Sequence, residues 1–318
     1  MAWTTTQLLA QIRRVASLPV ASTVTGYTDD DLLMHADAAL QGRLAPLVAN
    51  ARDEHAVHTV DVAVAAGQTA VRLPPRVASG RLRDVTQLAT DGVSYVSVPR
   101  LEPEDAAQFS LSIPTSPQSV AVVVQAGFLR IVPSPVTAMT LRLSYVRMPS
   151  ALAAVATCTL ATGMTAGTPN FTVTHAGTLA AGAYDFALLS NGDSLGDSVA
   201  TVTPAVGSTT FAAASMGPLF QNLTAELARY VAEGVYLCPQ GTSCVVALPN
   251  NLSPLLALHA AAAFCRTIGD SEAADLHGAS AQAMEKQLIP LLSERVEGEP
   301  QVVRPTFQNR GRSFWRGW

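Results

Sequence analysis

Residues 253–290 read SPLLALHAAAAFCRTIGDSEAADLHGASAQAMEKQLIP, and this stretch predicts two helices joined by a tight turn. Its first half is apolar nearly all round, which is typical of a buried helix. Ser253 and Pro254 form an N-cap and first-turn pair. Gly269 is expected to end this helix, and Asp270 to cap a second helix whose apolar residues recur at spacings of three and four. The stretch therefore predicts a C-terminal αα-hairpin.

The start of the chain also predicts helices. Thr4 is followed three residues later by Gln7, which is a capping-box pattern. Thr28 precedes three aspartates, whose carboxylates suit the positive end of a helix dipole. We expect this second helix to run to about Asp53, with a kink at Pro46.

Between these helical parts the apolar pattern takes a period of two. Alternating runs over residues 57–148, separated by Gly, Pro and Asp-Gly turns, predict a compact antiparallel β unit. One short helix is expected within it, over residues 102–109. Residues 154–215 are rich in Thr, Ala, Gly and Ser and predict a small inserted β module. A helix over 219–231 and a hairpin over 235–248 are expected to follow.

These patterns together predict an α+β fold in four parts. N-terminal helices and the antiparallel β unit occupy residues 1–153, and the inserted β module occupies 154–218. The helix, the hairpin and the αα-hairpin occupy 219–300, where Pro290 ends or kinks the last helix. Residues 301–318 form an extended tail.

The tail is basic and aromatic, whereas the chain as a whole has a formal net charge of −4. No acidic residue follows Pro300, so the body is more acidic than this total. One interpretation is a disordered end whose arginines keep it soluble. The aromatics favour a segment that orders on a partner, because Trp and Arg are enriched where interfaces concentrate binding energy. The predicted partner-binding residues are Arg304, Phe307, Arg310, Arg312, Phe314, Trp315, Arg316 and Trp318.

Composition limits the function classes. Hydrophobic residues make up 48% of the chain and charged residues 14%, which favours a subunit whose surface is covered in an assembly. We expect no membrane association, because no apolar run is long enough to cross a bilayer and the start lacks a signal-peptide pattern. The four cysteines suggest free thiols in a reducing compartment, although a disulfide between Cys238 and Cys244 stays open. No cofactor-binding or metal-binding pattern is found.

One motif points to catalysis. The string NGDSLG (residues 191–196) satisfies the Gly-x-Ser-x-Gly pattern of serine hydrolases, with Ser194 as the nucleophile. A nucleophile elbow needs a strand followed by a helix, whereas alternating strand patterns both precede and follow this string. We therefore interpret it as a surface turn and predict no catalytic residue.

The order of these parts resembles the head-to-tail adaptor (neck, or connector) proteins of tailed bacteriophages. The resemblance rests mainly on residues 248–303, including RVEGEP at 295–300 followed by a basic tail. The strands RLRDVTQL and MTLRLSYVRMP resemble the family's central β unit, and EGVYLCPQGTSCVVALP its connection to the hairpin. Residues 154–215 are the least typical of the family, together with the aromatic density of the tail.

The resemblance implies a structural virion protein rather than an enzyme, with no cofactor. It implies a homo-oligomeric ring, commonly of twelve copies, at the head-tail junction of a virion assembled in the bacterial host cytoplasm. The C-terminal segment would bind the portal protein, the opposite face a downstream neck or tail protein, and genomic DNA would pass through the channel. The alternatives are a tail terminator or tube-like component and, on the residues alone, a serine esterase using Ser194.

Overall fold

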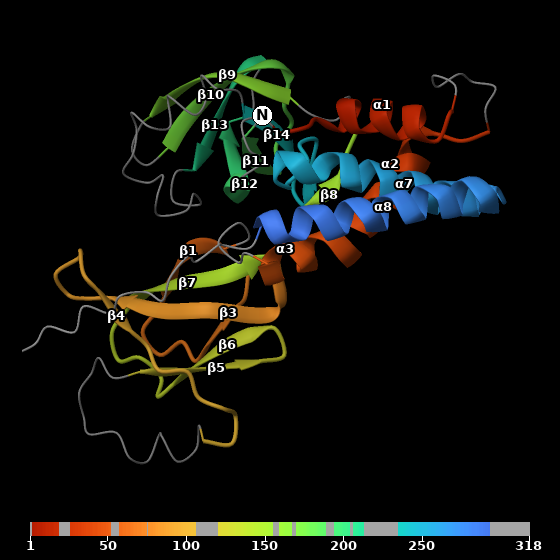
Figure 1. The fold of residues 1–318 in the computed structure, drawn as a ribbon. Coiled ribbons are helices and arrows are strands. Elements are labelled where there is room, and N and C mark those ends of the chain that lie inside the picture. Colours follow the sequence, from red (N-terminus) through yellow and green to blue (C-terminus); the bar gives the residue numbers. More distant parts are fainter. Residues whose placement is uncertain are drawn as a thin grey trace, which may run out of the picture.

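The computed structural model describes residues 2–18, 26–51, 57–74, 76–105, 120–154, 159–166, 170–188, 194–203, 206–212 and 235–292. These residues form a mixed α and β structure of three bodies: a helical layer, a β sandwich and a closed β barrel. Figure 1 shows the barrel and the sandwich as separate bodies, with the helical layer beside both.

The helical layer combines both ends of the described chain. It contains α1 (Thr5–Val15), α2 (Asp29–Ala39), the π-helix η1 (Leu40–Leu44), α3 (Ala45–Ala51), the 3₁₀-helix η5 (Asn250–Leu252), α7 (Ser253–Thr267) and α8 (Ser271–Leu292). Both predicted N-termini are confirmed, because Thr4 forms a capping box with Gln7 and Thr28 forms one with Asp31. The apolar faces of α1 and α2 share one core with α7. This core includes Leu8, Leu32 and Leu256.

Where a kink was expected, the structure has a π-turn, η1, just before Pro46. Pro46 has no N–H to donate to the carbonyl four residues earlier, and its ring crowds that carbonyl. The backbone widens instead, and the N–H of Ala45 donates to the carbonyl of Leu40, five residues back. The chain is helical from Asp29 to Ala51 without a break.

The αα-hairpin is confirmed, with one correction. At the end of α7, Gly269 adopts a φ of +86°, and the N–H of Asp270 donates to the carbonyl of Cys265, which is a Schellman ending. Asp270 then caps α8 through the N–H of Ala273. The predicted N-cap at Ser253 is wrong by one residue: the 3₁₀ turn of η5 precedes α7, so Leu252 takes the cap position. Pro290 lies inside α8, which continues to Leu292.

The antiparallel β unit is a sandwich of two sheets. Its strands are β1 (Val57–Val64), β2 (Ala70–Arg72), β3 (Val77–Leu88), β4 (Tyr95–Ser97), β5 (Ala121–Gln125), β6 (Phe128–Val132) and β7 (Met139–Arg147). One sheet has the order β1-β7-β3-β4 and the other β2-β6-β5. Inward residues of both sheets, such as Leu129 and Leu143, form one core. Of the helix predicted over residues 102–109, the described part is a turn; the remainder lies outside the described residues.

The inserted module is a closed barrel. It contains β9 (Thr159–Ala166), β10 (Asn170–Thr178), β11 (Ala183–Leu188), β12 (Ser194–Thr203), β13 (Val206–Ala212) and β14 (Val235–Pro239). Phe186 and Phe211 meet edge to face in its interior, with ring centroids 5.1 Å apart. The helix predicted over 219–231 lies outside the described residues.

The chain enters and leaves the barrel at adjacent points. The short strands β8 (Ala151–Leu152) and β15 (Thr242–Ser243) precede and follow the barrel, and they pair in parallel. The hairpin predicted over 235–248 is therefore wrong in its pairing: β14 pairs with β9 and β11, whereas β15 pairs with β8. The four-part domain division stays a prediction.

Candidate functional site

The residues predicted to bind a partner all lie outside the described residues. They are Arg304, Phe307, Arg310, Arg312, Phe314, Trp315, Arg316 and Trp318. The last described element before them is α8, which ends at Leu292. Only Ala274, Ala281 and Leu292 are fully buried on this long helix, so α8 presents most of its surface outward.

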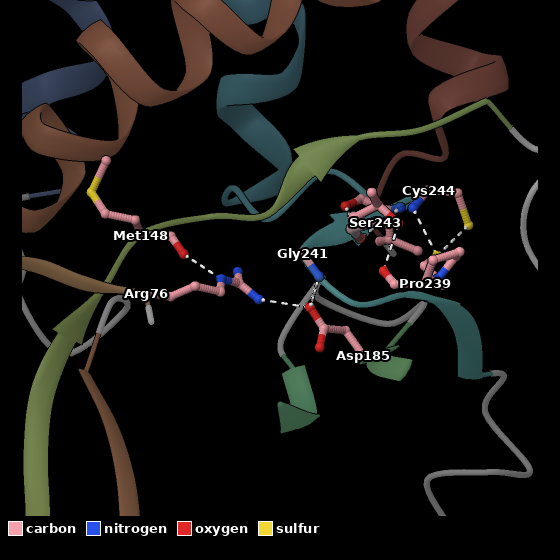
Figure 2. A network of polar contacts seen from close by, with 10 residues as sticks. Arg76, Met148, Asp185, Pro239, Gly241, Ser243 and Cys244 are labelled. Carbon is pink, nitrogen blue, oxygen red and sulfur yellow. Dashed lines mark hydrogen bonds and ion pairs between the residues drawn. The ribbon is translucent and has the colours of Figure 1, made fainter. Parts of the chain in front are cut away.

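A buried carboxylate joins the barrel to the sandwich (Figure 2). Asp185, on β11, has a side chain only 5% exposed, and its Oδ2 accepts from the N–H of Gly241 at 3.0 Å. The same oxygen lies 3.4 Å from Nη1 of Arg76, the residue just before β3. The Nε of Arg76 donates to the carbonyl of Met148 at 2.9 Å. One carboxylate and one guanidinium thus tie together β11, the turn after β14 and the ends of β3 and β7.

The N-terminal residues add a second connection at this junction. The N–H of Thr5 donates to the carbonyl of Cys244, and the N–H of Val246 donates to the carbonyl of Trp3, both at 2.9 Å. These bonds attach the start of α1 to the segment that leaves the barrel. The sulfur atoms of Cys238 and Cys244 lie here 3.8 Å apart, so the disulfide left open from the sequence is not formed.

A third connection joins the helical layer to β8. Oδ1 of Asp37, on α2, accepts from the N–H of Leu152 at 2.7 Å. Burial raises the pKa of Asp37 from 3.8 to about 6, against the opposing effect of this hydrogen bond. Asp37 therefore fixes the helical layer against the strand that leads into the barrel.

A polar cluster lies where the π-turn meets the αα-hairpin. Arg43, on η1, donates twice to Oε2 of Glu285 on α8, at 2.7 and 3.0 Å. Nε2 of His259, on α7, lies 3.4 Å from the same oxygen. Burial, and after it the charge of Arg43, lowers the pKa of His259. His259 is half-buried in this cluster, which fixes the N-terminal helices against the hairpin.

These contacts hold the parts of the structure together. Among the described residues no group of three or more His, Cys, Asp or Glu side chains could hold a metal ion. The backbone of β12, which begins at Ser194, pairs antiparallel with β11. A strand therefore stands where a nucleophile elbow needs a helix. No described helix is long and apolar enough to cross a membrane.

Sequence reasoning missed the connections between the bodies. Arg76 and Asp185 are 109 residues apart in the chain, and Asp37 and Leu152 are 115 apart. The one available signal was a lone Asp among the apolar residues of AYDFALL, because an ionised side chain in a buried strand requires a partner.

Comparison with known protein families matches residues 3–230 to a family described as SU10 adaptor protein. No curated protein matches the chain. The match includes residues 154–215, which were expected to be least typical, and ends before 248–303, on which the resemblance mainly rested. It covers the N-terminal helices, the sandwich and most of the barrel. The chain therefore belongs to the SU10 adaptor protein family of phage head-to-tail adaptors, which makes it a structural component of the virion at the head-tail junction.

Proposed function

We propose that the chain forms a closed ring beneath the portal of a phage capsid, commonly of twelve copies, and is assembled in the host cytoplasm. One face of the ring binds the portal protein, and the opposite face binds a downstream neck or tail protein. The observation that carries this proposal is the family match over residues 3–230.

The C-terminal tail supplies the portal contact in this proposal. It follows α8, whose surface is mostly outward, and it holds aromatic and arginine residues without any acidic residue. Such residue types concentrate binding energy when a partner desolvates them. The aromatics Phe314, Trp315 and Trp318 act as anchors, and the arginines contact acidic groups of the portal.

The charge of the body suits a channel for DNA. The net charge of −4 includes the basic tail, so the remainder of the chain is more acidic than this value. An acidic wall repels phosphate and prevents the genome from adhering during passage. We therefore expect DNA to pass without sequence-specific contact.

Removal of residues 309–318 tests the docking tail. All described elements are retained in this truncation, so the protein should fold with unchanged circular dichroism and thermal unfolding. It should fail to co-sediment with portal-bearing capsids that lack an adaptor. If the truncated protein binds these capsids as the full chain does, the tail does not dock on the portal.

Two point variants separate the contributions of the tail. Replacement of Phe314, Trp315 and Trp318 by alanine should weaken capsid binding at every salt concentration. Replacement of the three arginines at 310, 312 and 316 by alanine should weaken capsid binding mainly at low salt, because salt screens exposed charges. Arg14→Ala with Arg266→Ala is the control, since both arginines are exposed on the helical layer.

A further inference from the structure

The three-stranded sheet of the sandwich carries a basic and aromatic patch on one face, formed by its edge strand β2 and its middle strand β6. Strand β2 is an edge strand, and its Arg72 lies directly opposite Phe128 on β6. Arg130 is opposite Ala70, so Arg72, Phe128 and Arg130 share one face of the sheet. All three side chains are exposed, Phe128 to 46%. We call these three residues the basic edge.

The opposite edge of the same sheet is acidic. Beyond β5, the segment of residues 99–101 runs beside Val122. The N–H of Leu101 donates to the carbonyl of Val122, and the N–H of Val122 donates to the carbonyl of Pro99. A turn follows at once, in which Glu102, Glu104 and Asp105 are all exposed, together with Pro103. We call residues 102–105 the acidic turn.

Both edges lack a charged partner within the described part of the chain. No described ion pair includes Arg72, Arg130, Glu102, Glu104 or Asp105. Arg130 donates to an amide oxygen, that of Gln125. Arg100, next to the acidic turn, instead donates to the carbonyl of Leu82. Within the described residues, the charges of both edges are therefore left for another molecule to pair with.

Arg72 and the acidic turn lie at opposite sides of the sheet. Neighbouring strands lie about 4.8 Å apart, so β2 and the segment beyond β5 are about 14 Å apart across β6 and β5, and Arg72 does not reach the acidic turn of its own chain. Opposite charges at opposite edges of a rigid sheet are instead arranged for head-to-tail contact between identical molecules. A contact of this heterologous kind builds a ring when its rotation closes.

We propose that the basic edge of one copy binds the acidic turn of the next copy, which makes this sheet a subunit interface. The inference rests on the proposed ring and adds the residues that hold its neighbours together. The arginines pair with Glu102 and Glu104, and Phe128 packs against Pro103. Exposed ion pairs contribute modestly to affinity, so the charges set the direction of association and the ring interface includes further surface.

Cysteine cross-linking between differently tagged chains tests this contact. An Arg72→Cys protein and a Glu104→Cys protein, mixed at high concentration under mild oxidation, should give a mixed dimer that a reductant dissolves. Neither protein alone should dimerise, because a heterologous contact never brings two copies of one edge together. A disulfide needs Cα atoms within about 7 Å, so chance proximity is not sufficient.

The control pair is Arg14→Cys with Glu272→Cys, which has the same residue types on exposed positions of the helical layer. It should give no mixed dimer. The proposal is overturned if the test pair gives no more mixed dimer than this control, or if either test protein dimerises alone to the same extent.

A charge exchange gives a second, independent readout. Arg72→Glu with Arg130→Glu makes both edges acidic, and Glu102→Arg with Glu104→Arg makes both basic. Each variant alone should lose self-association in sedimentation velocity, whereas an equimolar mixture should regain it with alternating copies. The control variant, Arg14→Glu with Lys286→Glu, has the same change in net charge as Arg72→Glu with Arg130→Glu, but on the helical layer. It should self-associate as the parent chain does.

These outcomes separate the interface from the proposed function. If the parent chain forms rings on portal-bearing capsids but the mixed cross-link is absent, the ring stands and this interface is wrong. If the mixed cross-link forms but no ring appears on capsids, the head-to-tail contact stands and the proposed function is wrong.

Discussion

Removal of the Asp185 carboxylate should loosen the attachment of the barrel to the sandwich. Asp185→Ala removes the carboxylate oxygen that accepts from the N–H of Gly241. It also removes the carboxylate beside the guanidinium of Arg76, whose side chain is only 14% exposed. An unsatisfied buried donor costs about 1–3 kcal/mol, and breaking a buried ion pair costs about 3–5 kcal/mol. Arg76 keeps its bond to the Met148 carbonyl, which favours the lower end of that range.

We therefore expect Asp185→Ala to lower the free energy of unfolding by about 3 kcal/mol. Asp185→Asn keeps an oxygen for Gly241 but loses the charge, so its cost should be about half as large. Urea denaturation at low salt measures both values. The exposed pair of Arg266 and Asp275, at a distance of 3.9 Å, supplies the control, and Asp275→Ala should cost less than about 0.5 kcal/mol.

A double-mutant cycle with Arg76→Met tests the pairing itself. If the two side chains interact as described, the double variant should cost less than the sum of the two single variants by about 1 kcal/mol or more. Equal stability of Asp185→Ala and the parent chain, or two single costs that simply add, would show that this ion pair does not stabilise the junction.

Three further predictions concern other parts of the fold. Because burial raises the pKa of Asp37 from 3.8 to about 6, the folded state binds this proton more tightly than the unfolded state. The free energy of unfolding should therefore fall as pH rises through this interval, and urea denaturation of Asp37→Asn should lack that component. Gly269→Ala places a side chain at a φ of +86° and should cost about 1 kcal/mol in thermal unfolding, whereas Gly42→Ala has no positive φ and should not destabilise. Cys238 and Cys244 should resist alkylation in the native protein and react in urea without a reductant; a disulfide in the purified protein would contradict this.

The helix ends and the strands could be predicted because local chemistry decides them. A capping box is completed within four residues, as at Thr4 and Thr28, and period-two alternation is a property of each strand by itself. The N-cap at Ser253 was misplaced because the 3₁₀ turn Asn250–Leu252 continues directly into α7, so the cap position is Leu252, one residue earlier. Such a turn leaves no separate signal in the sequence.

The pairing between distant segments could not be predicted. β14 alternates as any strand of a hairpin would, and only the barrel shows that it closes the sheet between β9 and β11. Likewise, the sequence showed an acidic EPED segment and scattered arginines, but the register of β2 with β6 was needed to place Arg72 beside Phe128. The candidate tail was identified from its residue types, and it lies outside the described residues.

A density map of the assembled neck would show directly whether the chain forms a ring beneath the portal. We expect copies of this chain in one closed ring between portal and tail, with residues 301–318 of each copy in contact with the portal. We also expect the DNA channel to pass through that ring. A map that places the chain elsewhere in the virion, or that shows these residues directed away from the portal, would contradict the proposed function.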